Sequence, residues 1–193
     1  ITNDNEICSD YLKSQLKVLE YSDKVIVDRI IKDPDKTALI NSCLDEIETA
    51  APFIDFVTKN ANEFEAGSLS AFDVIAVSKD GEEVYGKVDG NTFFSSILYD
   101  ELEQKEWVSD GWMYSLSNAY FVGKSNEETK SIRSVFAKAF GVREIQKVAF
   151  VDDILLQNID ELKENLANAD SNIDFWRWIK DRKSTRLNSS HDQ

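Results

Sequence analysis

Residues 72–85 read Phe72-Asp73-Val74-Ile75-Ala76-Val77-Ser78-Lys79-Asp80-Gly81-Glu82-Glu83-Val84-Tyr85, and this stretch decides the fold. Two runs of β-forming residues flank the Asp-Gly step, and that pattern is the strongest short-range signal for a β-hairpin. All seven glycines of the chain lie within or beside residues 72–142. We therefore predict a hairpin here, inside a central region that is rich in turns.

The central region continues with an aromatic stretch from Thr92 to Val122, which we expect to be irregular. A helix is predicted to follow, from about Asn126 to Phe140. It should end at Gly141, because a residue that tolerates a positive φ angle suits a helix C-cap.

The N-terminal segment, residues 1–65, is predicted to form a helical layer. A first helix runs to about Tyr21, and the β-branched run that ends at Asp33-Pro34 is interpreted as a second helix, although a strand fits it too. A third helix is expected from Asp35, and Ala51-Pro52 is expected to begin a short fourth helix. Apolar residues recur at helical spacing in the first and third segments: Cys8, Leu12, Leu16, Leu19, Leu39, Ile40, Cys43, Leu44 and Ile47.

Residues 147–180 are predicted to form C-terminal helices, one at about 148–167 and a last one at 172–180 that begins at a capping Ser171. Residues 66–146 hold the hairpin, the aromatic segment and the helix that follows it, and the polar residues 60–70 form the expected hinge. The predicted fold class is therefore α+β, with a helical N-terminal layer, a central hairpin region and C-terminal helices.

The C-terminal residues 181–191 read Asp-Arg-Lys-Ser-Thr-Arg-Leu-Asn-Ser-Ser-His, which resembles one translated reading frame of a common sequencing adapter. We therefore expect the natural sequence to end near Lys180 and residues 181–193 to be a non-native tail. The alternative is a genuine polar tail. His191, the one histidine of the chain, lies in this tail.

The charge of the chain argues against two classes of partner. Its formal net charge is −14 at pH 7, so it repels phosphate backbones and anionic lipid surfaces. No apolar run approaches the roughly 20 residues that a membrane-spanning helix needs. We expect neither nucleic acid nor a membrane as partner.

The two cysteines, Cys8 and Cys43, are too few for a disulfide framework, and each lies on an apolar helical stripe. We expect both to be buried free thiols in a reducing cytoplasm. Without a histidine outside the tail, the chain has no histidine general base, no Ser-His or Cys-His pair and no histidine-bearing metal motif.

One enzyme-like pattern remains as an alternative. Asp73, Glu82 or Glu83 and Lys87 resemble the two acids and the lysine of a restriction-type nuclease site, which holds Mg²⁺ between carboxylates. Lys87 lies four residues after Glu83, about 13 Å along a strand at roughly 3.3 Å per residue, whereas the nuclease pattern needs a separation of two. A solvated hairpin face is the simpler interpretation.

The tryptophans are the candidate interaction residues. Trp107 and Trp112 lie in the aromatic stretch and either line a binding surface or form the core that lets this stretch fold. Trp176 and Trp178 point to different sides of the predicted last helix, so that helix is expected to have two apolar partners. We predict that one of these partners is the following unit of a longer parent chain.

Five segments carry a family resemblance: residues 72–81, Leu98-Tyr99-Asp100-Glu101-Leu102, Trp107-Val108-Ser109, Ala119-Tyr120-Phe121-Val122 and Val135-Phe136-Ala137-Lys138-Ala139-Phe140-Gly141-Val142. Their order resembles the repeat region of sacsin-like proteins, and Phe175-Trp176-Arg177-Trp178-Ile179-Lys180 resembles the start of the next unit. The resemblance covers about half of the chain and rests on loose patterns of apolar and turn residues.

The resemblance implies a very large, chaperone-like or defence-associated parent with a GHKL-type ATPase module. No Asp-x-Gly-x-Gly motif occurs here, so the ATP-binding residues of that module cannot be placed on this chain. We expect a non-catalytic structural or interaction segment with no catalytic residue, metal site or cofactor. Its expected partners are adjacent repeats of the same parent chain or another protein.

Overall fold

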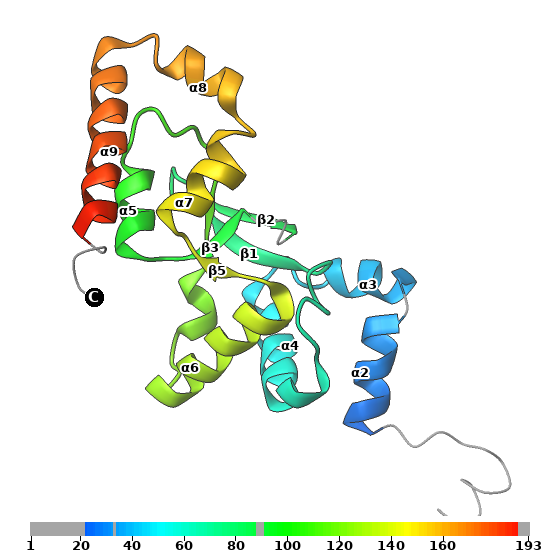
Figure 1. Ribbon diagram of the computed structural model, residues 1–193. Coiled ribbons are helices and arrows are strands. Elements are labelled where there is room, and N and C mark those ends of the chain that lie inside the picture. The colour runs from blue at the N-terminus through cyan, green and yellow to red at the C-terminus, as the bar shows by residue number, and fades with distance from the viewer. Residues whose placement is uncertain (1–21, 33, 88–90, 189–193) are drawn as a thin grey trace, which may run out of the picture.

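The computed structural model describes residues 22–32, 34–87 and 91–188 (Figure 1). A mixed sheet lies at the centre, with α4 (Ile47–Lys59) and α6 (Asn126–Val135) on one side of it. On the other side lie α5 (Ile97–Glu103), α7 (Lys147–Ala149) and α9 (Ala169–Asn188). The predicted α+β fold class is confirmed.

The sheet has five strands in the order β2-β1-β4-β3-β5. β1 pairs in antiparallel fashion with β2 and β4, whereas β3 pairs in parallel fashion with β4 and β5. The strand bounds are β1 Asp73–Val77, β2 Glu83–Lys87, β3 Thr92–Phe94, β4 Tyr114–Leu116 and β5 Arg143–Glu144.

The predicted hairpin is confirmed as β1 and β2. The N–H of Ser78 donates to the carbonyl of Glu82 at 2.9 Å, and the N–H of Gly81 donates to the carbonyl of Ser78 at 3.0 Å. Gly81 has a φ angle of +82°, which a glycine adopts without strain and which a three-residue hairpin loop requires. The Asp-Gly step therefore sets the turn.

The prediction that residues 92–122 are irregular is wrong. This stretch holds β3, α5 (Ile97–Glu103), β4 and a 3-10 turn at Asn118–Phe121. Each strand has three residues, too few to show a period in the sequence. Their pairing depends on partners far along the chain.

The N-terminal helices are α2 (Asp23–Lys32), α3 (Pro34–Asn41) and α4 (Ile47–Lys59), followed by a 3-10 turn at Ala61–Glu63. The helical interpretation of the β-branched run is therefore confirmed. The first predicted helix, with Cys8, lies outside the described residues.

The third and fourth predicted helices have the wrong boundaries. α3 ends at Asn41, and α4 begins at Ile47 instead of Ala51 and includes Pro52. Packing of the buried Ala50, Ile54 and Val57 outweighs the hydrogen bond that Pro52 removes. Because α3 ends before Cys43, the apolar pattern predicted at residues 39–47 does not lie on one helix, and Cys43 is exposed. The prediction of a buried thiol there is wrong.

The central helix α6 (Asn126–Val135) agrees with its prediction. Ser125 and Glu128 form a reciprocal capping box at its start, and a π-helical turn, Phe136–Phe140, continues it. Gly141 ends this turn with a φ angle of +84°, as its conformational freedom predicts.

The C-terminal part differs from the single helix predicted at 148–167. It contains α7 (Lys147–Ala149), a π-helical turn (Phe150–Leu155) and α8 (Ile159–Asn165). The helical structure is therefore interrupted between Leu155 and Ile159. The last helix, α9 (Ala169–Asn188), starts earlier than predicted. The side chain of Asn168, rather than Ser171, caps it by accepting from the N–H of Asp170 at 2.8 Å.

The buried residues form two clusters on opposite sides of the sheet. The N-terminal core joins helices α2, α4 and α6 to the sheet and includes Val27, Ile54, Phe72, Phe94, Phe136 and Phe140. The tryptophan core lies beneath α5, α7 and α9 and includes Phe93, Tyr99, Trp107, Trp112, Phe150, Phe175 and Trp178. The neighbours Phe93 and Phe94 point to different clusters because side chains alternate along a strand.

Truncation at Lys180 tests the tail prediction. α9 continues through residue 188. If residues 181–193 were never selected to pack, their removal should change the melting temperature by no more than about one or two degrees, because surface changes of this kind stay within about 0.5 kcal/mol. Thermal unfolding followed by circular dichroism measures this, and a drop of many degrees would show that the tail is real structure.

Candidate functional site

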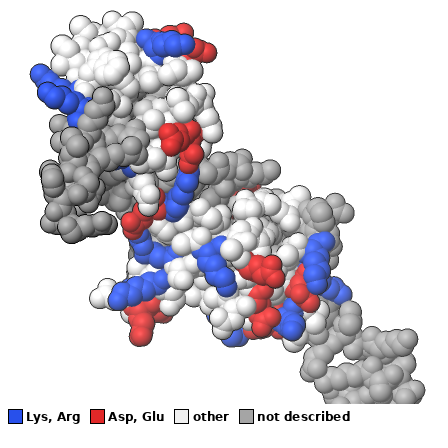
Figure 2. All heavy atoms as spheres, viewed as in Figure 1, with Lys and Arg blue, Asp and Glu red and all other residues white. Residues whose placement is uncertain are grey.

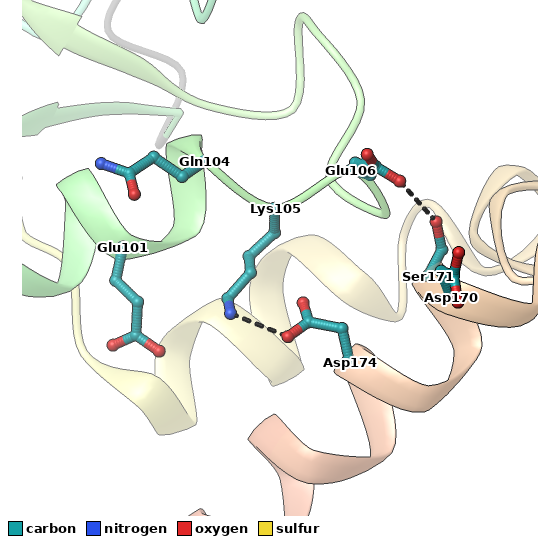
Figure 3. Close-up of a pocket in the computed structure, with 7 residues that line it drawn as sticks. All are labelled: Glu101, Gln104, Lys105, Glu106, Asp170, Ser171 and Asp174. Atoms are coloured by element: carbon teal, nitrogen blue, oxygen red, sulfur yellow. Dashed lines mark hydrogen bonds and ion pairs between the residues drawn. The ribbon is translucent and has the colours of Figure 1, made fainter.

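A hollow of about 370 Å³ lies between the end of α5 and the first turns of α9 (Figure 3). Four carboxylates surround a single lysine in this hollow, which we call the α5–α9 hollow. Its lining residues are Glu101, Gln104, Lys105, Glu106, Asp170, Ser171 and Asp174.

Both walls of the hollow are fixed by capping and burial. The Ser96 side chain accepts from the N–H of Tyr99 at 3.2 Å and so caps α5. Tyr99 and Leu102 then bury the inner face of α5. On the other wall, Asn168 caps α9, whose Ser171 is itself buried.

Two polar contacts cross the hollow (Figure 3). The Nζ of Lys105 lies 3.1 Å from Oδ1 of Asp174, and the hydroxyl of Ser171 donates to Oε2 of Glu106 at 3.3 Å. Gln104 points away from both pairs. The hollow therefore connects α9 to the loop after α5, and two of its acids already have partners.

Two buried indoles extend this connection into the tryptophan core. Trp107 donates its Nε1–H to Oδ2 of Asp174 at 3.0 Å, and Trp112 donates to Oε2 of Glu161 at 2.7 Å. One carboxylate oxygen of Asp174 thus pairs with Lys105, and the other accepts the hydrogen bond from Trp107. Hydrogen bonds from Ser109 and then from Trp112 lower the pKa of Glu161 below its ordinary value.

The polar side chains of the hollow have a structural role, because they link α9 to the loop after α5. Lys105 forms an ion pair with Asp174, so a carboxylate of the hollow already engages it. Within residues 22–32, 34–87 and 91–188, no group of three or more His, Cys, Asp or Glu side chains is placed to hold a metal ion. The carboxylates favour a cationic neighbour but are not arranged as a metal centre.

The four residues of the nuclease-like alternative do not come together. Asp73 is the register partner of Lys87 at one end of the hairpin, whereas Glu83 pairs with Val77 at the other end. The Glu83 carboxylate accepts from the hydroxyl of Ser117 at 3.1 Å. Glu82 follows the hairpin turn and is exposed. The acids are therefore dispersed along a hairpin rather than gathered in a pocket.

The structure places three of the four candidate tryptophans inside. Trp107 is 0%, Trp112 3% and Trp178 3% exposed, so these rings form core and not surface. Trp176 is 59% exposed and packs edge to face against Phe175, with the two ring centroids 5.4 Å apart. Trp176 is the one member of the predicted interaction set that the structure leaves at the surface.

Sequence reasoning missed the carboxylates that hold the indoles. Asp174 lies 67 residues from Trp107, and Glu161 lies 49 residues from Trp112. A local pattern does not show such pairs. The available signal is chemical: a buried tryptophan usually has an acceptor for its N–H, and acids on a neighbouring helix can supply one. The rule is not strict here, since the buried Nε1–H of Trp178 has no hydrogen-bond partner among the described residues.

Comparison with known proteins finds no family model, no curated protein and no solved structure that matches the chain. Among the described residues, no helix is both long enough and apolar enough to cross a membrane. The function is therefore proposed from the geometry of the chain itself.

Proposed function

We propose that this chain is a non-catalytic structural or interaction segment of a large, sacsin-like protein, and that the outer face of α9 is its contact surface. In this proposal the parent is chaperone-like or defence-associated, and its ATPase module lies outside this segment. The partner of α9 is the adjacent unit of the same parent chain.

The exposed side of α9 is the observation that carries the proposal. Ile173 is 49% and Trp176 59% exposed, and these residues are three positions apart, so they share one face of the helix. The opposite face packs Phe175 and Trp178 into the tryptophan core. A helix that is apolar on two sides is typical of an element with a partner on each.

Footprinting of Trp176 tests this proposal. A form of the protein extended by the sequence that follows Lys180 in its parent should protect the Trp176 ring from hydroxyl radicals several-fold, compared with the present chain. Trp178 is the internal control, because the core already covers it in both forms. Equal labelling of Trp176 in the two forms would rule out α9 as the contact surface.

The proposal also predicts an absence of chemistry. The present chain should not cleave DNA with Mg²⁺, because Asp73 and Glu83 lie at opposite ends of the hairpin. It should not hydrolyse ATP, because its sequence has neither an Asp-x-Gly-x-Gly motif nor a glycine-rich phosphate loop. Gel assays and phosphate-release assays measure the two activities against a buffer control. Cleavage that Asp73→Ala or Glu83→Ala abolishes would instead support the nuclease-like alternative.

A further inference from the structure

A second hollow, of about 480 Å³, lies between α6 and the edge strand β5. We call it the α6–β5 groove. Lys130, Arg133 and Ala137 line it from α6 and the turn that follows, and Phe94, Val142 and Glu144 line it from the sheet side. It lies on a different surface from the α5–α9 hollow and shares no residue with it.

The floor of the groove is apolar, and the guanidinium group of Arg133 lies over it. Phe94 and Val142 are buried, and the Cζ of Arg133 lies 4.2 Å from the centroid of the Phe94 ring. Stacking on an aromatic face fixes the plane of an arginine and leaves its N–H groups free to donate in that plane. Arg133 is therefore pre-oriented at the base of the groove.

The one carboxylate beside Arg133 is not close enough for a hydrogen bond. An Nη of Arg133 lies 3.6 Å from an Oε of Glu144, and both side chains are partly exposed. Hydrogen bonds from guanidinium to carboxylate are about 2.7 to 2.9 Å long, so this pair is electrostatic only. A carboxylate from another chain can bind Arg133 more closely than Glu144 does.

The wall formed by β5 is the edge of the sheet. β5 is the last strand of the described order and pairs with β3 on one side. Successive residues of a strand direct their backbone groups to opposite sides, so one of the two residues Arg143 and Glu144 points its N–H and C=O away from β3. An extended peptide beside β5 can use those groups.

The charge of the groove is unusual for this chain. The whole chain carries a net charge of −14, whereas the groove combines the side chains of Lys130 and Arg133 with one acid, Glu144. Lys130 is exposed, whereas the guanidinium of Arg143 lies 5.7 Å from the centroid of the Phe93 ring and pairs with Asp153 at 2.7 Å, so it does not contribute to the charge of the groove. Figure 2 shows Lys and Arg side chains interspersed with Asp and Glu on the face where Figure 1 places α6 and β5.

From these features we infer that the α6–β5 groove binds an extended acidic peptide segment of a protein partner. One peptide carboxylate pairs with Arg133, and a second lies near Lys130. Glu144 competes with the peptide for Arg133. This inference goes beyond the proposed role of α9 and does not depend on it.

Selection from a random nonapeptide display library against the full chain tests this inference. The selected peptides should be enriched in Asp and Glu. Fluorescence anisotropy with the most enriched peptide then gives Kd for the unchanged chain and for four variants, each checked for folding by circular dichroism.

Lys130→Glu and Arg133→Gln should each raise Kd roughly tenfold or more, because each removes a charge-assisted contact. Glu144→Gln should lower Kd, because it removes the internal competitor. Lys24→Glu, an equal change of charge at an exposed position of α2, is the matched control and should leave Kd within about twofold.

Two results would overturn the inference. One is a selection that yields no acidic enrichment or no binding peptide at all. The other is an enriched acidic peptide whose Kd changes as much in Lys24→Glu as in Lys130→Glu and does not fall in Glu144→Gln, since its binding then follows net charge and not the groove.

Discussion

Replacing Trp107 by alanine should lower the free energy of unfolding by about 3–5 kcal/mol, the usual range for truncating a large buried aromatic side chain. Trp107 is 0% exposed, and its ring centroid lies 5.1 Å from that of Phe175 and 5.4 Å from that of Trp178. The truncation removes the centre of this cluster and leaves a cavity. Urea unfolding followed by circular dichroism measures the loss.

Trp176→Ala is the matched control for this measurement, since it removes the same side chain from an exposed position on α9. It should change the free energy of unfolding by about 0.5 kcal/mol or less. Similar losses for the two variants would contradict the assignment of Trp107 to the core and Trp176 to the surface.

The second large effect is expected from Asp174→Ala, at about 1–3 kcal/mol, because the change leaves the Nε1–H of a fully buried indole without an acceptor. Asp174 also pairs with Lys105, but that ion pair is partly exposed and contributes little, about 0–1 kcal/mol. The same urea unfolding experiment measures the change.

Two further variants separate these contributions. Lys105→Ala removes the ion pair alone and should cost less than Asp174→Ala. Asp174→Asn keeps an oxygen acceptor for Trp107 and should also cost less. If Lys105→Ala costs as much as Asp174→Ala, the ion pair and not the indole bond is what stabilises the α5–α9 hollow.

The parts of the fold that were predictable from the sequence depend on local signals. The hairpin follows from the Asp-Gly step, and the end of the central helix follows from Gly141, whose φ angle is +84°. The helix at residues 23–32 was favoured over a strand, and it has a local cap in Ser22, whose hydroxyl accepts from the N–H of Val25 at 3.4 Å, and a proline after it. Each of these signals lies within a few residues of the feature that it predicts.

The parts that failed depend on contacts far apart in the sequence. The parallel pairing of β3 with β5 brings Phe93 beside Arg143, although β5 has only two residues. Pro52 is accepted inside α4 because the helix buries an apolar face that the local pattern does not reveal. Cys43 is exposed because α3 ends before it.

The candidate site shows the same division. The two-sided character of the last helix was predictable, because Trp176 and Trp178 are two positions apart and so point in different directions. Which ring faces outward, and that Asp174 accepts from Trp107, depends on the packing of α9 against the loop after α5. These facts required the tertiary structure.

Sedimentation velocity over a range of concentrations tests the contact surface on α9 most directly. The unchanged chain should self-associate through the exposed face that holds Ile173 and Trp176, because under the proposed function the partner of this apolar surface lies outside the chain. Trp176→Ser should then sediment as a monomer with unchanged stability, while Trp178→Ser should be strongly destabilised. A chain that is monomeric at every concentration, or that associates equally well with Trp176→Ser, would contradict the claim that this face of α9 is a contact surface.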